Sequence, residues 1–177
     1  MKLTRGALVS LCCLLPLLIF SFFVNLPALP IRVWDEARNA NTALEMYLHH
    51  NWIVPTYDGL PDMWNSKPPL LIWMQVAAMQ LFGIGELAVR LPAAVSALAT
   101  GLLLWAFCSR QCEKPWSGFL AGAVLASTYA YVFNHAGRTG DYDSPLTLFL
   151  TGYSLSAFIY ATSGDRKWIG GGRAMSH

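Results

Sequence analysis

Three short polar segments hold the side chains of this chain that could do chemistry. Residues 34–38 read Trp-Asp-Glu-Ala-Arg, residues 67–69 read Lys-Pro-Pro, and residues 138–145 read Arg-Thr-Gly-Asp-Tyr-Asp-Ser-Pro. Each segment lies close to a long apolar stretch of the sequence. A carboxylate can accept a proton, and a lysine or arginine can stabilise a phosphate. One joint site therefore requires a fold that brings all three segments to the same side of a membrane.

Each segment also has an ordinary structural interpretation. Asp35 is a good helix N-cap, and Glu36 suits a first helical turn. Lys67 can extend its side chain to lipid headgroups. Ser144, followed by proline, can cap a helix whose dipole Asp143 complements. Capping does not account for the second acid and the arginine in that short loop.

Taken together, the three segments suit the transfer of a sugar from a lipid phosphate. Asp35, Asp141 and Asp143 are the candidate catalytic acids, because one carboxylate must accept the proton of the acceptor. Lys67 and Arg138 are the candidate ligands of the donor phosphate. Free N–H groups at the start of the helix after Lys67 would add to this anion site. The site must lie at the bilayer surface, where a polyprenyl chain can present its headgroup.

The composition indicates a membrane protein. Of the 177 residues, 55% are hydrophobic and 12% are charged, and the formal net charge is +2. A soluble domain has about 25% charged residues, so an ordinary soluble enzyme and a disordered chain are excluded. The small net charge predicts no nucleic-acid partner.

Four apolar blocks predict membrane-spanning helices at 7–24, 91–108, 116–133 and 146–162. Each block approaches the roughly 20 residues that cross a hydrocarbon core as a helix. The alternative for the first block is a signal peptide, but its apolar run exceeds the usual ~7–15 residues. The predicted fold class is an all-α polytopic membrane protein, with residues 1–162 in the transmembrane domain and 163–177 in a cytoplasmic tail.

The remaining basic residues predict the orientation of the chain. The positive-inside rule assigns these to the cytoplasm: Lys2, Arg5, Arg110, Lys114, Arg166, Lys167 and Arg173. Residues 25–90 then form an outer loop, and all three polar segments face outward. Within this loop, residues 36–50 predict an amphipathic helix in the interface plane. Its apolar face would hold Ala37, Ala40, Leu44, Tyr47 and Leu48. Residues 68–82 predict a juxtamembrane helix, since their apolar core is short for a span; a crossing helix is the alternative.

A series of motifs resembles bacterial members of glycosyltransferase family 39. In order, the motifs are residues 34–38, 51–55 (Asn-Trp-Ile-Val-Pro), 67–70 (Lys-Pro-Pro-Leu), 81–83 (Leu-Phe-Gly), 89–92 (Val-Arg-Leu-Pro) and 138–143 (Arg-Thr-Gly-Asp-Tyr-Asp). The resemblance covers residues 34–150. The family includes protein O-mannosyltransferases and the transferases that add aminoarabinose to lipid A.

The resemblance implies a GT-C-type transmembrane helical bundle in the bacterial inner membrane with a periplasmic active face. It implies inverting transfer from an undecaprenyl- or dolichyl-phosphate sugar to a lipid, glycan or protein acceptor. By position, Asp35 matches the family's general base and Lys67 matches the residue that contacts the lipid phosphate. Asp143 best matches the acid of the second outer loop, with Asp141 as its close rival.

The same resemblance has implications for three further positions. Glu36 and Arg38 would support the first loop. Ser66 stands where lipid A-type enzymes often carry glutamate, which argues against the aminoarabinose subgroup and against a metal held there. We expect either no cofactor or a divalent metal.

Two alternative functions are open from the sequence alone. A transporter fragment would place acids inside its spans, whereas the four apolar blocks contain none. A non-catalytic, truncated membrane protein is the other alternative. Members of the resembled family usually continue with more spans, so we expect this chain to be the N-terminal portion of a larger enzyme.

Overall fold

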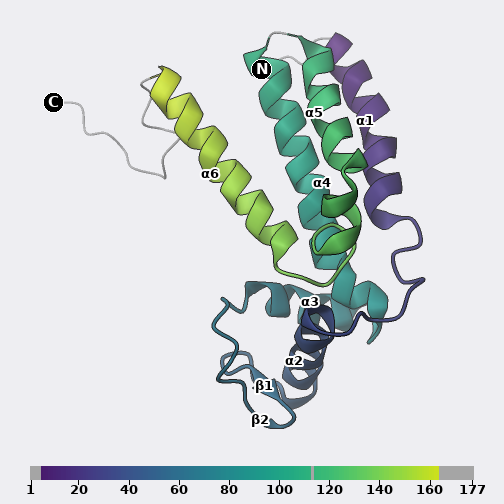
Figure 1. Ribbon diagram of the computed structural model, residues 1–177, viewed down its shortest axis with the longest axis vertical. Helices are drawn as coiled ribbons and strands as arrows, with labels where there is room; N and C mark the ends of the chain where they lie inside the picture. The colour runs from purple at the N-terminus through teal and green to yellow at the C-terminus, as the bar shows by residue number, and fades with distance from the viewer. Residues whose placement is uncertain (1–4, 113, 164–177) are drawn as a thin grey trace, which may run out of the picture.

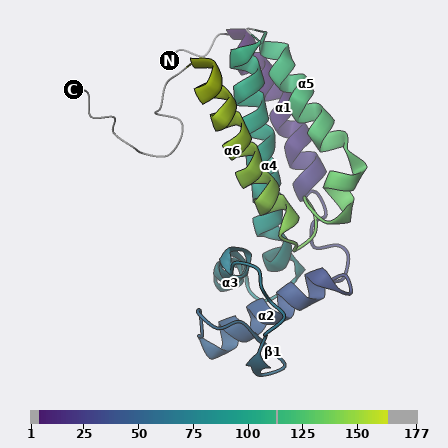
Figure 2. The same cartoon turned by 60° about the vertical axis from the view of Figure 1, so that its left-hand side comes forward.

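The computed structural model describes residues 5–112 and 114–163. In it, α1 (Arg5–Phe23), α4 (Glu86–Gln111) and α5 (Pro115–Ser127) lie side by side, and α6 (Asp143–Ser163) packs against α4 (Figures 1 and 2). By length and composition, α1 and α4 are the two described helices that could cross a membrane. This helical bundle confirms the predicted fold class; spans at α5 and α6 remain predictions.

The expected span at 116–133 is divided. α5 ends at Ser127, Thr128 has an extended backbone, and a π-helical turn, η1 (Ala130–Asn134), follows. The hydroxyls of Ser127 and Thr128 both donate to the carbonyl of Val124, at 3.1 and 2.7 Å. Such local bonds compete with a regular helical ladder. The apolar block predicted the location of the helix but not this break.

Two glycines allow α5 to approach its neighbours closely. A Cβ at Gly118 would lie 2.5 Å from the carbonyl oxygen of Trp105 in α4, and one at Gly122 would lie 2.7 Å from the Leu14 side chain in α1. Small residues four apart permit such close helix packing in membranes. Leu14 and Phe22 of α1 are fully buried in the resulting core.

A smaller outer layer lies at one end of the bundle (Figure 1). It consists of α2 (Asp35–His49), an antiparallel hairpin of β1 (Thr56–Tyr57) and β2 (Leu60–Pro61), and α3 (Leu70–Phe82). Figure 2 shows α2 lying across the direction of the bundle. α2 packs on α3, and α3 packs on α4. The outer layer is thus attached to the bundle mainly through the start of α4.

α2 matches the helix predicted at 36–50, but it packs on the protein through a different face. The buried residues are Glu36, Asn39, Thr42, Ala43 and Met46, whereas Leu48 of the predicted apolar face is 57% exposed. Two of the buried side chains are strongly polar, so the spacing of apolar residues did not reveal this face. Ala40 and Tyr47 of the predicted apolar face also pack against the buried cluster that contains Met46, and the contact of that face with the membrane interface stays a prediction.

The predicted caps are also corrected. Asp35 is the first helical residue of α2, and Trp34 occupies the N-cap position without a side-chain bond to the helix. Ser144 lies inside α6, where its hydroxyl donates to the carbonyl of Ala93 in α4 at 2.7 Å. Asp35 is therefore not the N-cap of its helix. The Ser144 hydroxyl bonds to a neighbouring helix instead of capping its own.

Candidate functional site

A buried ion pair between Glu36 of α2 and Arg90 of α4 joins the outer layer to the bundle. Arg90 Nε donates to Glu36 Oε1 at 2.7 Å, and Nη2 donates to Oε2 at 3.1 Å. The two side chains are 1% and 3% exposed. The other guanidinium bonds reach the carbonyls of Leu26, Leu29 and Pro30 at 2.7–3.0 Å. One arginine therefore holds the α1–α2 linker, α2 and α4 together.

Glu36 also binds the second outer loop. Its Oε1 accepts the N–H of Gly140 at 2.9 Å, and its Oε2 accepts the N–H of Arg32 at 2.8 Å. Burial alone would raise the pKa of Glu36, but the bonds from Arg90, Arg32 and Gly140 outweigh burial and lower it below its ordinary value. These bonds favour the ionised carboxylate of Glu36, which ties segment 34–38 to segment 138–145.

Asp141 lies at the same junction and is nearly buried. Asn39 Nδ2 donates to the carbonyl of Gly140 at 3.0 Å and reaches Asp141 Oδ1 at 3.5 Å. Asp141 Oδ2 is 3.4 Å from His135 Nδ1. Gln75 of α3 donates to the carbonyl of Gly140 at 3.3 Å from the other side. Side chains from α2 and α3 therefore fix the backbone that carries Asp141.

The buried position of Asp141 predicts a measurable pH dependence. Burial raises the pKa of Asp141, and Glu36 raises it further, although Thr139 and His135 offset part of this rise. A raised carboxyl pKa favours the protonated native state, so stability falls as pH rises from about 3.8 through the native pKa. We expect the Asp141→Asn protein to lack this loss when melting temperatures are measured by circular dichroism across acid pH. Asp143→Asn, at an exposed position on the same loop, is the control; parallel curves for wild type and Asp141→Asn would contradict the prediction.

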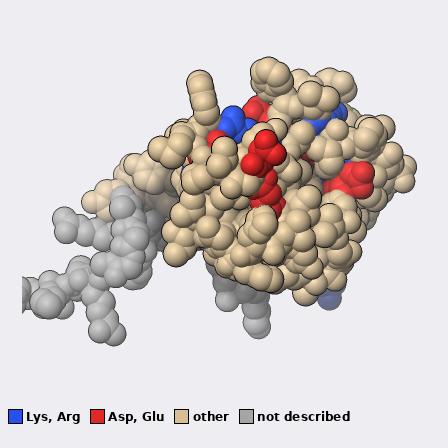
Figure 3. Space-filling view, turned by 90° about the horizontal axis from the view of Figure 1, so that it is seen from below, with Lys and Arg blue, Asp and Glu red and all other residues tan. Residues whose placement is uncertain are grey.

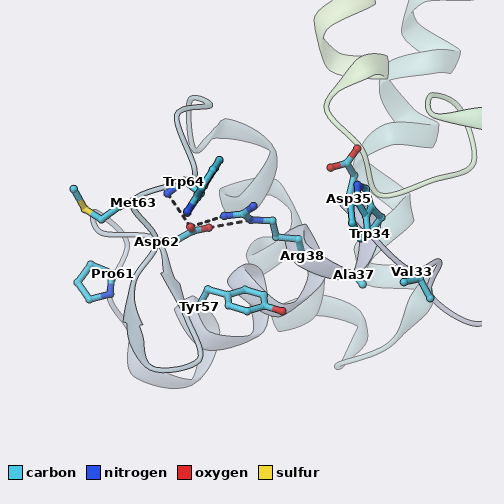
Figure 4. A pocket seen from close by; sticks show the side chains of 10 residues that line it. All are labelled: Val33, Trp34, Asp35, Ala37, Arg38, Tyr57, Pro61, Asp62, Met63 and Trp64. Atoms are coloured by element: carbon cyan, nitrogen blue, oxygen red, sulfur yellow. Dashed lines mark hydrogen bonds and ion pairs between the residues drawn. The ribbon is translucent and has the colours of Figure 1, made fainter.

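Asp35 occupies a different environment, exposed on the first turn of α2. It lines a hollow of about 640 Å³ between α2 and the hairpin region (Figure 4). No described residue donates a hydrogen bond to its carboxylate. The preceding Trp34 has φ 95° and ψ −120°, a strained conformation for a bulky residue that is found mostly at functional positions. Asp35 is therefore the predicted acid best placed to meet a ligand.

Arg38 forms the opposite part of the same hollow. Its Nη2 lies 2.6 Å from Asp62 Oδ1 and its Nε lies 3.2 Å from Oδ2, a bidentate pair (Figure 4). The Asp62 side chain is 4% exposed, whereas that of Arg38 is 40% exposed. The guanidinium also lies 6.0 Å from the ring centre of Tyr57. Arg38 thus connects α2 to the residues around the hairpin, and its supporting role in a catalytic loop stays a prediction.

Lys67 meets the second outer loop at Tyr142. Its Nζ lies 4.9 Å from the centre of the Tyr142 ring, within the range of a cation–π contact. Tyr142 separates the two acids of that loop, and Asp143 is exposed at the start of α6. The fold therefore brings Lys67 and segment 138–145 together, and Figure 3 shows acidic and basic side chains gathered on this end of the molecule.

Arg138 is engaged elsewhere. Its Nη1 and Nη2 donate to the carbonyls of Ser21 and Val24 at 3.0 and 2.6 Å. These carbonyls lie at the C-terminal end of α1, where they have no partner within the helix. Arg138 therefore has a structural role in joining the second outer loop to the end of α1, and its contact with the donor phosphate stays a prediction.

Sequence reasoning missed four residues that build this region. They are Asn39, Asp62, Gln75 and Arg90. Arg90 had a recognisable signal, because a lone arginine next to an otherwise apolar block is costly unless it is paired. The other three residues gave no such signal, because amide and carboxylate side chains are common on protein surfaces. As for metals, the described residues contain no cluster of three His, Cys, Asp or Glu side chains that could hold one.

Comparison with known proteins identifies the class as a GT-C-type polytopic membrane protein. The chain belongs to the dolichyl-phosphate-mannose-protein mannosyltransferase family, whose model matches residues 66–175. Its fold resembles that of ArnT from Cupriavidus metallidurans bound to undecaprenyl phosphate, with a TM-score of 0.68 at 21% identity over 84% of this chain. Family membership confirms the predicted glycosyltransferase resemblance.

Relatives of known sequence agree with this assignment. The chain is 30% identical over 158 residues to the undecaprenyl phosphate-alpha-4-amino-4-deoxy-L-arabinose arabinosyl transferase of Shewanella sediminis, covering 86% of this chain. It is 32% identical over 127 residues, 72% of this chain, to the protein of the same name from Pseudomonas savastanoi. The chain spans only 27% and 23% of these two relatives.

Proposed function

We propose that these residues serve the transfer of a sugar from a polyprenyl phosphate to an acceptor hydroxyl at the outer face of the bacterial inner membrane. The acceptor is a lipid, a glycan or a protein. The observation that carries the proposal is the contact between Lys67 and Tyr142, which places a cation beside the acidic second loop. A cation and carboxylates from separate loops are what phosphate departure and proton removal require.

In the proposed reaction, Asp35 is the general base. Its carboxylate accepts the proton of the acceptor hydroxyl while the acceptor oxygen bonds to the anomeric carbon. The bond from that carbon to the phosphate oxygen breaks, and the polyprenyl phosphate leaves with the electron pair. Attack opposite the leaving group inverts the anomeric configuration. Lys67 stabilises the charge that develops on the phosphate. Asp143 is exposed at the start of α6.

The proposed orientation of the chain in the membrane rests on where the basic residues lie along the helical bundle. Arg5 begins α1 and Arg110 lies in the last turn of α4, so both occupy the end away from α2 and α3. The positive-inside rule assigns that end to the cytoplasm. The candidate site then faces the periplasm, at the level where a lipid-linked sugar presents its headgroup.

The test is a transfer assay with membranes that contain this chain. Membranes are incubated with undecaprenyl-phosphate sugars labelled in the sugar, together with lipid A, cell-wall glycan or a Ser/Thr-rich peptide. Transfer of label, with an inverted anomeric configuration in the product, supports the proposal. Absence of transfer to every acceptor class would favour the non-catalytic alternative.

Lys67 provides a prediction about the donor. We expect Lys67→Ala to raise the KM for the lipid-phosphate sugar tenfold or more, because a charge-assisted contact contributes about 1.5–3 kcal/mol. Lys67→Arg should restore most of the affinity, since it keeps the charge. Lys114→Ala, at an exposed lysine near the opposite end of the bundle, is the matched control. Equal donor KM values for Lys67→Ala and Lys114→Ala would contradict the assignment.

A further inference from the structure

The hollow beside Asp35 is bordered by large apolar side chains that the fold leaves in water. Trp34, Met63 and Trp64 are 83%, 90% and 86% exposed, and all three line it (Figure 4). Isolated exposed apolar residues are ordinary, but several around one concavity indicate a binding surface. The volume of about 640 Å³ lies within the usual range for small-molecule sites.

Burial in the membrane does not account for Met63 and Trp64. They lie two and three residues after β2, and the hairpin lies at the end of the molecule farthest from the helical bundle (Figures 1 and 2). In the proposed orientation this segment projects away from the bilayer. Trp34 is held differently, by a strained backbone that is fixed on both sides: the Ala37 N–H donates to Arg32 O and the Arg38 N–H to Trp34 O, at 3.1 and 2.9 Å.

The polar groups of the hollow suit a neutral ligand with hydroxyl groups. The charge of Arg38 is balanced by Asp62 at 2.6 Å, so the hollow offers no free cation to an anion. The exposed part of the guanidinium and the Asp35 carboxylate can still bond to hydroxyls. Aromatic rings next to such groups suit a sugar, because its C–H face packs on the ring while its hydroxyls bond at the edge.

We propose that this hollow is the acceptor subsite and that it binds the saccharide part of the acceptor, with Trp64 stacking on a sugar ring. This inference rests on the proposed function for the role of Asp35 and deepens it by naming the acceptor class. Asp35 and Arg38 line the hollow, whereas Lys67, Asp141 and Asp143 do not. The residues assigned to the acceptor are therefore separate from the one assigned to the donor phosphate.

The experiment measures binding without the donor, so it does not depend on transfer. The full chain is solubilised in lauryldimethylamine oxide, because a maltoside or glucoside detergent would compete. Saturation-transfer-difference NMR is recorded with maltotriose and with N-acetylglucosamine as probes, and with a Ser/Thr-rich peptide as the contrasting ligand. We expect saturation of the sugar C–H protons, and an increase in Kd of about fivefold or more in Trp64→Ala, as for a lost aromatic contact.

Two variants make the result specific. Trp64→Phe retains an aromatic ring and should restore most of the binding. Trp116→Ala removes another exposed tryptophan, 55% exposed and near the other end of the bundle, and should bind sugar like wild type. The inference is overturned by saturation of the peptide alone, by no sugar binding, or by equal effects of Trp64→Ala and Trp116→Ala. Trp64-dependent sugar binding with no transfer activity would uphold the subsite and reject the proposed function.

Discussion

Replacing Asp35 with asparagine is expected to lower the rate of sugar transfer by about 10²–10⁴-fold, because the amide cannot accept the acceptor proton. The exchange preserves the size of a side chain that is exposed and accepts no hydrogen bond from the described residues. The variant should therefore insert and melt like wild type. The measurement is kcat with labelled donor, combined with circular dichroism of the purified protein.

Asp58→Asn is the matched control for this experiment. Asp58 is an exposed acid in the turn between β1 and β2, outside the hollow, and its φ of 55° is one that asparagine adopts readily. We expect wild-type transfer from it. Near-normal transfer by Asp35→Asn would remove Asp35 as the base, and the same exchange at Asp143 would then test the second loop.

The second large effect concerns stability. Arg90→Met is expected to destabilise the fold by about 3–5 kcal/mol, because it leaves the buried Glu36 anion without its main partner. Three backbone carbonyls of the α1–α2 linker lose their donor as well. Denaturant unfolding of the solubilised protein, followed by circular dichroism, measures the loss.

A second substitution, at Glu36, tests whether the destabilisation by Arg90→Met comes from the unpaired buried charge or from lost packing. The double variant Glu36→Leu with Arg90→Met removes both charges, so it should be more stable than Arg90→Met alone. Arg110→Met replaces an exposed arginine near the other end of the same helix and should have little effect. Equal stability of Arg90→Met and Arg110→Met would show that the buried pair does not hold the outer layer.

The two effects are linked through the geometry of the first loop. Glu36 follows Asp35 directly, and its bonds to Arg90 and Gly140 fix the start of α2 relative to the bundle and to the second loop. A catalytic group must be held within a fraction of an ångström of its working position. Glu36, predicted only as a supporting residue, is therefore the side chain on which the placement of Asp35 depends.

Some predicted roles changed because the sequence does not show which partners a side chain will meet. Arg138 carries the right charge to bind a phosphate, but the structure bonds it to the C-terminal carbonyls of α1. Asp141 and Asp143 were close rivals in sequence. The structure separates them: Asp141 lies against Asn39 and His135, whereas Asp143 is exposed. A shift of two residues across a helix start was enough to place them in different environments.

The sequence by itself determined which segments are helical and apolar, that the chain is a membrane protein, and which three polar segments are the candidates for its chemistry. These properties depend on composition and local order, which a chain carries before it folds. Only the tertiary structure decided that Glu36 is paired with Arg90, 54 residues away, and bonded to Gly140, 104 residues away. It also decided that α2 buries Glu36 and Asn39 and that Lys67 meets Tyr142. The physical reason is that a buried polar group must be paired within the protein, and the partner is chosen by packing between distant helices, which no local pattern records.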